Sequence, residues 1–133
     1  MLENMLKNYN SSKYELTISE NIEIQGRKNL IRRSIGNVIE NGLSYGEKVF
    51  IELKKSVGNA VIIIEDNGPG ISKKEYQNVF KPFYRIDKSR SLNKSGVGLG
   101  LSISQDIIKA HGGNIVLSES KHGGLSVKIS LPL

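Results

Sequence analysis

Two asparagines lie four residues apart in a segment with helical periodicity, residues 27–45. Asn37 and Asn41 would stack on one face of that helix, opposite an apolar stripe formed by Ile31, Ile35 and Val38. Their side-chain carbonyl oxygens are hard, neutral ligands of the kind that Mg²⁺ accepts alongside water and substrate phosphates. Taken alone, two exposed asparagines indicate an ordinary solvated helix face, and only a position facing a cleft would make them metal ligands.

A carboxylate follows the apolar run Val61–Ile64, where Asp66 opens the sequence Asp66-Asn67-Gly68-Pro69-Gly70. We expect Asp66 to lie where a buried strand ends, and a carboxylate there requires a hydrogen-bonding partner. The exocyclic amino group of adenine would be such a partner, and the glycines would let backbone approach a flat ring. The same residues also form a tight turn without any ligand, so the residues alone leave both interpretations open.

Glycines alternate with larger residues from Gly96 to Leu101, where another helix is expected to begin. Backbone N–H groups at a helix N-terminus favour phosphate, so this run is a candidate phosphate-binding loop. It follows a polar stretch instead of a strand, unlike the dinucleotide-binding fingerprint, and no Lys-Ser or Lys-Thr follows the glycines as in a Walker loop.

The composition fits a single globular domain. The chain has 133 residues and a net charge of +6, from 19 Lys and Arg against 13 Asp and Glu, and no Cys, which excludes disulfides and thiolate metal sites. The longest apolar stretch, Ala60–Ile64, is too short to cross a bilayer, and the polar start Met1–Asn10 does not resemble a signal peptide. Five basic residues and one acid, Asp87, lie between Lys81 and Ser95.

Hydrophobic periodicity predicts alternating strands and helices. Expected strands contain the residue groups 14–18, 22–24, 49–53, 60–64, 114–119 and 125–131, and expected helices cover 27–45, 73–80 and a segment from near Gly98 to Ala110. Hairpins require antiparallel neighbours, so we predict an α+β two-layer sandwich: a mixed, mostly antiparallel sheet of about five strands with three helices on one face. Residues 1–12 are predicted to be a linker from a preceding domain, and residues 13–133 the folded domain.

Together these motifs resemble the catalytic ATP-binding domain of sensor histidine kinases. Asn37 and Asn41 resemble the N box, residues 66–70 the first glycine box, residues 80–85 (Phe-Lys-Pro-Phe-Tyr-Arg) the F box, and residues 96–101 the second glycine box. Four ordered boxes across residues 30 to 131 are far more specific than any one of them. The tail and the Pro-Phe pair are similar to those of EnvZ-type osmosensor kinases.

The resemblance implies the Bergerat ATP-binding fold and a protein-histidine kinase that uses ATP and Mg²⁺. It implies Asn37, Asn41 and Arg85 as catalytic residues, with Asn41 and Asn37 on the metal. It also implies Asp66 as the acceptor of the adenine amino group, and the basic stretch from Lys81 to Ser95 as an ATP lid. The nucleotide-binding residues that it implies are Asn41, Tyr45, Lys48, Asp66, Gly68, Gly70, Ile71, Phe80, Arg85, Ile86, Gly96, Val97, Gly98, Leu99, Gly100 and Leu101.

The chain departs from the family pattern at two positions. Ser44 stands where many relatives have Lys or Arg, so Lys48 or a cation of the lid would have to replace that phosphate contact, and Val97 stands where Thr is frequent. Neither His111 nor His122 has the sequence context of the family's phosphoacceptor. The acceptor is therefore expected on a separate dimerisation and histidine-phosphotransfer domain.

Further expectations concern partners and location. A response regulator would act downstream, and the domain would be cytoplasmic, in a parent protein of the bacterial inner membrane. No nucleic-acid partner is expected, because the basic residues lack the interleaved aromatics of a stacking surface. No direct membrane contact is expected of this fragment either. Two alternatives remain: a stand-alone anti-sigma factor serine kinase of the same fold, and a nucleotide-binding regulatory module without transfer activity.

Overall fold

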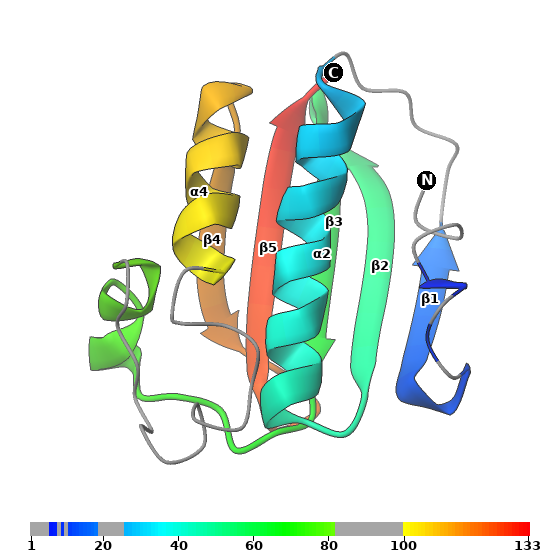
Figure 1. The fold of residues 1–133 in the computed structure, drawn as a ribbon, viewed down its shortest axis with the longest axis vertical. Coiled ribbons are helices and arrows are strands. Elements are labelled where there is room, and N and C mark those ends of the chain that lie inside the picture. Colours follow the sequence, from blue (N-terminus) through cyan, green and yellow to red (C-terminus); the bar gives the residue numbers. More distant parts are fainter. Residues whose placement is uncertain (1–5, 8, 10, 19–25, 82–99) are drawn as a thin grey trace.

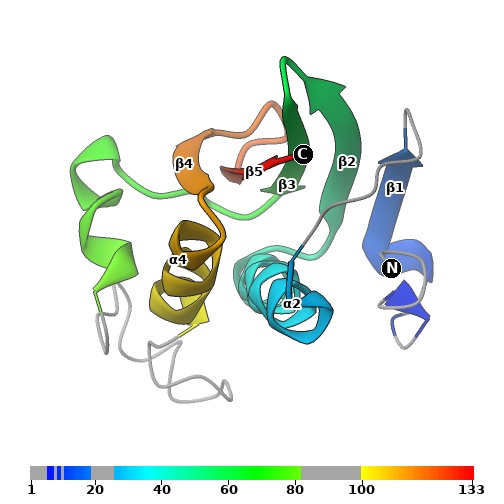
Figure 2. The same cartoon turned by 90° about the horizontal axis from the view of Figure 1, so that it is seen from above.

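A sheet and a layer of helices make up the computed structural model, which describes residues 6, 7, 9, 11–18, 26–81 and 100–133. The strands are β1 (Tyr14–Ile18), β2 (Val49–Ser56), β3 (Asn59–Asp66), β4 (Asn114–Glu119) and β5 (Leu125–Pro132). The helices are α2 (Lys28–Tyr45) and α4 (Gly100–Ala110), with short 3₁₀ turns η1 (Ser11–Lys13), η2 (Lys73–Glu75) and η3 (Asn78–Phe80). Both long helices lie on the same side of the sheet, and the other face carries none of the described helices (Figures 1 and 2).

The strand order is β1-β2-β3-β5-β4, with β1 parallel to β2 and every other pairing antiparallel. The parallel pair is connected through α2, as a crossover requires, while tight turns connect the antiparallel hairpins β2–β3 and β4–β5. The predicted mixed, mostly antiparallel sheet of five strands is confirmed. The further strand expected at Ile22 and Ile24 lies outside the described residues.

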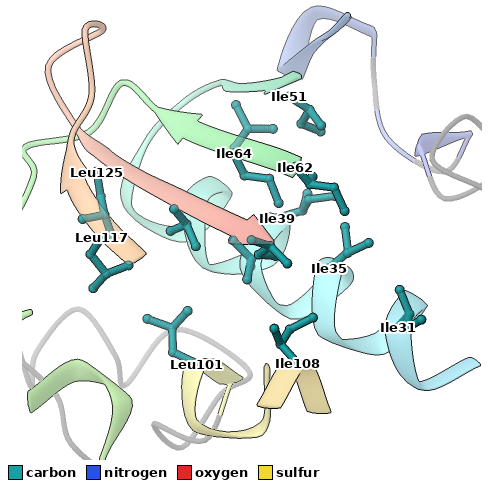
Figure 3. Packing of buried hydrophobic residues seen from close by; sticks show 14 of the residues in the cluster. Ile31, Ile35, Ile39, Ile51, Ile62, Ile64, Leu101, Ile108, Leu117 and Leu125 are labelled. Carbon is teal, nitrogen blue, oxygen red and sulfur yellow. The ribbon is translucent and has the colours of Figure 1, made fainter. Parts of the chain in front are cut away.

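The core fills the space between sheet and helices. The apolar stripe of α2, with Ile31, Ile35 and Ile39 all at most 2% exposed, packs against Ile51, Ile62 and Ile64 on the central strands (Figure 3). Burial of this stripe, more than local propensity, stabilises the helix. It begins after Arg27 and ends at Gly46, as predicted for residues 27–45.

Hydrogen bonds between α2 and α4 hold the two helices together. The Ser34 hydroxyl donates to the Ser104 carbonyl at 3.2 Å, and the Ser104 hydroxyl donates to the Ser34 carbonyl at 2.7 Å, both in the buried interface. The Arg27 amide donates to His111 Nε2 at 3.1 Å, while His111 Nδ1 lies 2.8 Å from the Ile107 carbonyl. A neutral imidazole with its proton on Nδ1 satisfies both contacts, so His111 has the helix-end position expected of it.

The helical segment expected at residues 73–80 differs in form from the prediction. It consists of two 3₁₀ turns, η2 and η3, separated by Tyr76 and Gln77, and the Ser72 side chain forms no cap at its start. Eight residues are too few for a stable helix unless packing directs them, and here Tyr76 and Phe80 both pack against the core. The three predicted helical segments are therefore present, the middle one as 3₁₀ turns.

The segment predicted as a linker contributes to the core. Leu6 is 1% exposed and belongs to the central hydrophobic cluster, and the Tyr9 hydroxyl donates a hydrogen bond to the Glu40 carboxylate on α2. Within residues 1–12, these side chains thus pack on the domain that they precede. The connection to a preceding domain stays a prediction. None of the described helices is both long and apolar enough to cross a membrane.

Candidate nucleotide-binding site

The Asp66 side chain occupies the end of β3, as the sequence predicted. It is 5% exposed, and its Oδ1 accepts hydrogen bonds from the Gly68 amide at 2.9 Å and from the Leu125 amide of β5 at 3.3 Å. These donors come from the loop after β3 and from the neighbouring strand. They fix the orientation of a buried carboxylate. A carboxylate held in one orientation can accept a hydrogen bond from the amino group of a ligand.

Glycines surround this carboxylate because no side chain fits there. A Cβ added to Gly124 would lie 1.9 Å from Asp66 Oδ1, and one added to Gly68 would lie 2.5 Å from the Tyr45 carbonyl oxygen. A Cβ on Gly42 of α2 would lie 2.7 Å from a methyl of Val49 and 3.9 Å from Asp66 Oδ2. The last turns of α2, the loop after β3 and the start of β5 therefore meet around Asp66.

Gly70 adopts φ = +73°, a conformation that residues with a side chain rarely adopt, and a Cβ there would lie 3.3 Å from the Gly123 carbonyl oxygen. The first glycine box is thus placed against the β4–β5 turn. The resemblance implied Gly68 and Gly70 as shapers of the base pocket. The Gly68 amide bonds Asp66 and Gly70 lies against the β4–β5 turn, while their role toward a base stays a prediction.

Asn67 has a structural role that the sequence reasoning missed. Its side-chain oxygen accepts hydrogen bonds from the Glu47 amide at 2.8 Å and the Lys48 amide at 3.1 Å, in the loop that leaves α2. Asn67 therefore joins the loop after β3 to the end of α2. The Asn-Gly pair at residues 67–68 was a usable signal, because Asn side chains commonly bond nearby backbone in turns.

The two candidate metal ligands lie on α2 near this site. Asn37 and Asn41 are half-buried one turn apart, and the Asn37 Cβ lies 4.0 Å from the Cβ position built on Gly100, at the start of α4. Asn41 directly precedes Gly42, where an added Cβ would lie 3.6 Å from the Asp66 Cβ. Among the described residues no group of three His, Cys, Asp or Glu could hold a metal. Amide oxygens combined with substrate phosphates are a donor set that fits Mg²⁺.

Lys48 is not brought to this site. Its Nζ forms an ion pair with Glu15 Oε2 at 2.8 Å and lies 5.4 Å from the centre of the Phe50 ring. Glu15 and Phe50 are paired on the helix-free face of the sheet, whereas Val49, next to Lys48, points into the core. The hydrogen bond from Lys48, together with its charge, lowers the pKa of the Glu15 carboxyl. Alternation along the strand thus directs Lys48 away from the face on which Asp66 meets α2.

The remaining predicted residues divide into those that the structure describes and those that it does not. Tyr45 ends α2 beside Gly68, and Ile71 and Phe80 are half-buried against the core. Gly100 and Leu101 open α4, where Leu101 is buried. The predictions for Arg85, Ile86, Gly96, Val97, Gly98 and Leu99, and for most of the lid, lie outside the described residues.

Comparison with known proteins gives one family. Residues 26–133 match the model of the histidine kinase-, DNA gyrase B- and HSP90-like ATPases. The chain is 35% identical to the sensor histidine kinase GtrS of Pseudomonas aeruginosa over 107 residues, which are 80% of this chain and 22% of GtrS. It is 33% identical to the sensor histidine kinase CpxA of Escherichia coli over 111 residues, which are 83% of this chain and 24% of CpxA. The chain therefore spans about a quarter of the length of these relatives.

Solved structures agree in fold. The mycobacterial sensor histidine kinase MprB aligns with a TM-score of 0.80 at 27% identity, covering 98% of this chain and 88% of that one. The histidine kinase domain of the E. coli osmosensor EnvZ aligns with a TM-score of 0.72 at 29% identity, covering 99% and 83%. With its Bergerat-type sandwich, and with Asp66, Gly68 and Gly70 gathered beside the helix of Asn41, the chain belongs to the histidine kinase-, DNA gyrase B- and HSP90-like ATPases.

Proposed function

We propose that this domain binds Mg-ATP beside Asp66 and donates the γ-phosphoryl group to a histidine on a separate dimerisation domain, in two-component signal transduction. The observation that carries the proposal is the buried Asp66 carboxylate, oriented by the Gly68 and Leu125 amides and enclosed by glycines. The family match over residues 26–133 and the likeness to GtrS and CpxA support it.

The residues of the proposed site act by positioning ATP. Asp66 accepts the adenine amino group, and Gly68 and Gly70 allow backbone to approach the base. Asn41 and Asn37, at the flank of α2, would hold Mg²⁺, whose charge would neutralise the phosphates. Phosphoryl transfer requires positioning and charge stabilisation more than covalent chemistry by the protein. The P–O bond to ADP breaks, a P–N bond to the acceptor imidazole forms, and the imidazole proton passes to solvent.

The partners follow from this chemistry. The acceptor histidine resides on the dimerisation and phosphotransfer domain of the same kinase, and a cognate response regulator takes the phosphoryl group from it. GtrS and CpxA are named as sensor histidine kinases, and this chain corresponds to about a quarter of each. We place the domain in the cytoplasm, within a parent protein of the bacterial inner membrane.

The experiment combines the chain with γ-labelled ATP and a separately produced, histidine-bearing dimerisation domain from a related sensor kinase. We expect an acid-labile, base-stable label on the second protein, and none on the chain incubated alone. Omission of Mg²⁺ should prevent transfer.

Other outcomes would identify the rivals. An acid-stable phosphoserine on a protein substrate would favour an anti-sigma factor kinase. Nucleotide binding by calorimetry without transfer to any of several dimerisation domains would favour a regulatory module. An absence of nucleotide binding would contradict the proposal altogether.

A further inference from the structure

Basic side chains gather at the end of the helix layer that lies far from Asp66. Arg27, Lys28, Arg32 and Arg33 lie at the start of α2, and Lys109 lies in the last turn of α4; we name these five residues the basic end. All are exposed except Arg32, which is half-buried. We propose that the basic end is a docking surface for an acidic segment of a partner protein, independent of the nucleotide site.

Two contacts between the helices show that the five residues lie at the same height along the helix axes. The Arg27 amide bonds His111, and Ser34 and Ser104 bond each other. Arg27 and Ser34 are seven positions apart, as are Ser104 and His111, so α2 and α4 run antiparallel and Lys109 is level with the first turn of α2. Figure 1 shows the start of α2 and the end of α4 at the same end of the molecule. The residues that surround Asp66 lie at the opposite end of α2, an 18-residue helix and therefore about 27 Å long.

No described acid neutralises these charges. The ion pair between Lys48 and Glu15 does not involve the basic end, and none of the five basic side chains forms a hydrogen bond or ion pair within the described part of the chain. The acid on these two helices nearest in sequence to Lys109 is Asp106, which is exposed and forms no ion pair with them. The five charges thus face solvent without intramolecular compensation in the described part of the chain.

The positions of these charges oppose helix stability. The first turn of α2 contains no acidic residue, although the positive end of the helix macrodipole favours acids there and repels Lys28. Like charges four residues apart, as Lys28 and Arg32 are, also repel each other. Residues that destabilise their own helix, with no nearby acid to offset their charge, are expected where those residues bind a partner.

The side chains of the basic end indicate which class of partner it binds. Charge complementarity alone suffices for an acidic protein segment, whereas a surface helix that inserts into lipid also uses an apolar or aromatic face, and a single-stranded nucleic-acid site uses aromatic stacking. None of the described aromatic residues belongs to the basic end. The exposed Val57 lies in the turn between β2 and β3, and Figure 2 shows this hairpin projecting away from the helices. The Leu133 amide bonds the same turn at the Gly58 carbonyl. The basic end thus fits a protein partner.

The test uses a triple variant, Lys28→Gln, Arg33→Gln and Lys109→Gln, and a matched control, Lys74→Gln, Lys121→Gln and Lys128→Gln, which removes the same charge from exposed positions elsewhere. The probe is a polyglutamate peptide of about 20 residues, titrated at low salt. We expect the triple variant to lose about tenfold in affinity and the control less than about twofold. ATP affinity and the melting temperature of the triple variant should not fall.

Each other outcome overturns the proposal. Equal losses in both variants would mean that net charge alone attracts the peptide. A lower melting temperature of the triple variant would mean that acids within the chain already pair with these cations. Unchanged peptide binding, with selective loss of binding to vesicles that contain phosphatidylserine, would identify a membrane surface instead. ATP binding and phosphotransfer are measured in separate experiments. A failure of the proposed kinase function would therefore not be confused with a failure of peptide binding at the basic end.

Discussion

The Leu125 amide donates a hydrogen bond to Asp66 Oδ1 at 3.3 Å, so the first residue of β5 helps to orient the carboxylate that ends β3. The two residues are 59 positions apart in sequence. The proposed base-recognition group therefore depends on the pairing of β3 with β5, and on the glycine turn that precedes Leu125. A substitution that distorts that turn should therefore weaken binding at the proposed nucleotide site, even though the turn carries no functional side chain.

Gly124→Ala tests this dependence. The new Cβ would lie 1.9 Å from Asp66 Oδ1 and 2.5 Å from the Asp66 carbonyl oxygen, so the start of β5 must shift. We expect the free energy of unfolding to fall by about 3 kcal/mol, as for other overpacked buried sites. ATP affinity should fall as well, measured by calorimetry at a temperature where the variant is folded.

Gly58→Ala is the matched control for that variant. Gly58 has φ = +76° and nothing within 4 Å of an added Cβ, so only backbone strain of about 1 kcal/mol is expected. Its ATP affinity should equal that of the unmodified chain. Equal losses of affinity in both variants would show that Gly124 acts only through general stability.

Asp66→Asn should weaken ATP binding by about a hundredfold, because a charged acceptor is replaced by a neutral amide that can also place a donor toward the base. Glu65→Gln is the control: Glu65 precedes Asp66 but lies on the other face of β3, where it pairs with Phe50 and Ser126. Calorimetry with ATP measures both, and circular dichroism checks that each variant is folded. Unchanged ATP affinity in Asp66→Asn would remove the basis of the proposed site.

Asn41→Ala should separate metal from base recognition. If Asn41 binds Mg²⁺, its loss weakens Mg-ATP binding by about tenfold or more and leaves metal-free ADP binding nearly unchanged, since the base contacts at Asp66 remain. Titrations with and without Mg²⁺ measure the difference. Equal losses for both ligands would argue against a magnesium role for this residue.

The elements were predictable because each has a clear pattern. The stripe of Ile31, Ile35 and Ile39 indicated α2, and the alternation of Val49 and Ile51 indicated β2, each confirmed within a few residues. The segment 73–80 was less clear, because its short length left tertiary packing of Tyr76 and Phe80 to decide between an α-helix and 3₁₀ turns.

The site was predictable only where a motif is local. Asp66, Gly68 and Gly70 lie within five residues of each other, and the structure joins Asp66 to the Gly68 amide and sets Gly70 against the β4–β5 turn, while their contact with a nucleotide stays a prediction. The reciprocal Ser34–Ser104 hydrogen bonds and the contact between Arg27 and His111 join residues 70 and 84 positions apart, so no local pattern announces them. Lys48 or a cation of the lid was expected to replace the phosphate contact missing at Ser44, but strand alternation directs the Lys48 side chain to the other face of the sheet, where it pairs with Glu15.

The last prediction concerns Tyr9 at high pH. Burial, together with the hydrogen bond that Tyr9 donates to Glu40 and the charge of Glu40, raises the pKa of Tyr9 from 10.0 to about 12. Because the folded-state pKa lies above the unfolded value, Tyr9 contributes stability that is fully present below pH 10 and is lost as pH rises to about 12. Tyr9 is half-exposed, so we expect this contribution to be about 1 kcal/mol after screening.

Tyr9→Phe should therefore be less stable than the unmodified chain at pH 8, and the difference should shrink between pH 10 and pH 12. Chemical unfolding at several pH values measures the difference, in which the titration of other tyrosines and lysines cancels. Glu40→Gln is the control, because it removes the charge while retaining a hydrogen-bond acceptor, and it should reduce the pH dependence without abolishing the contact. A stability difference that stays constant from pH 8 to pH 12 would show that Tyr9 titrates normally and that its contact with α2 is not formed in solution.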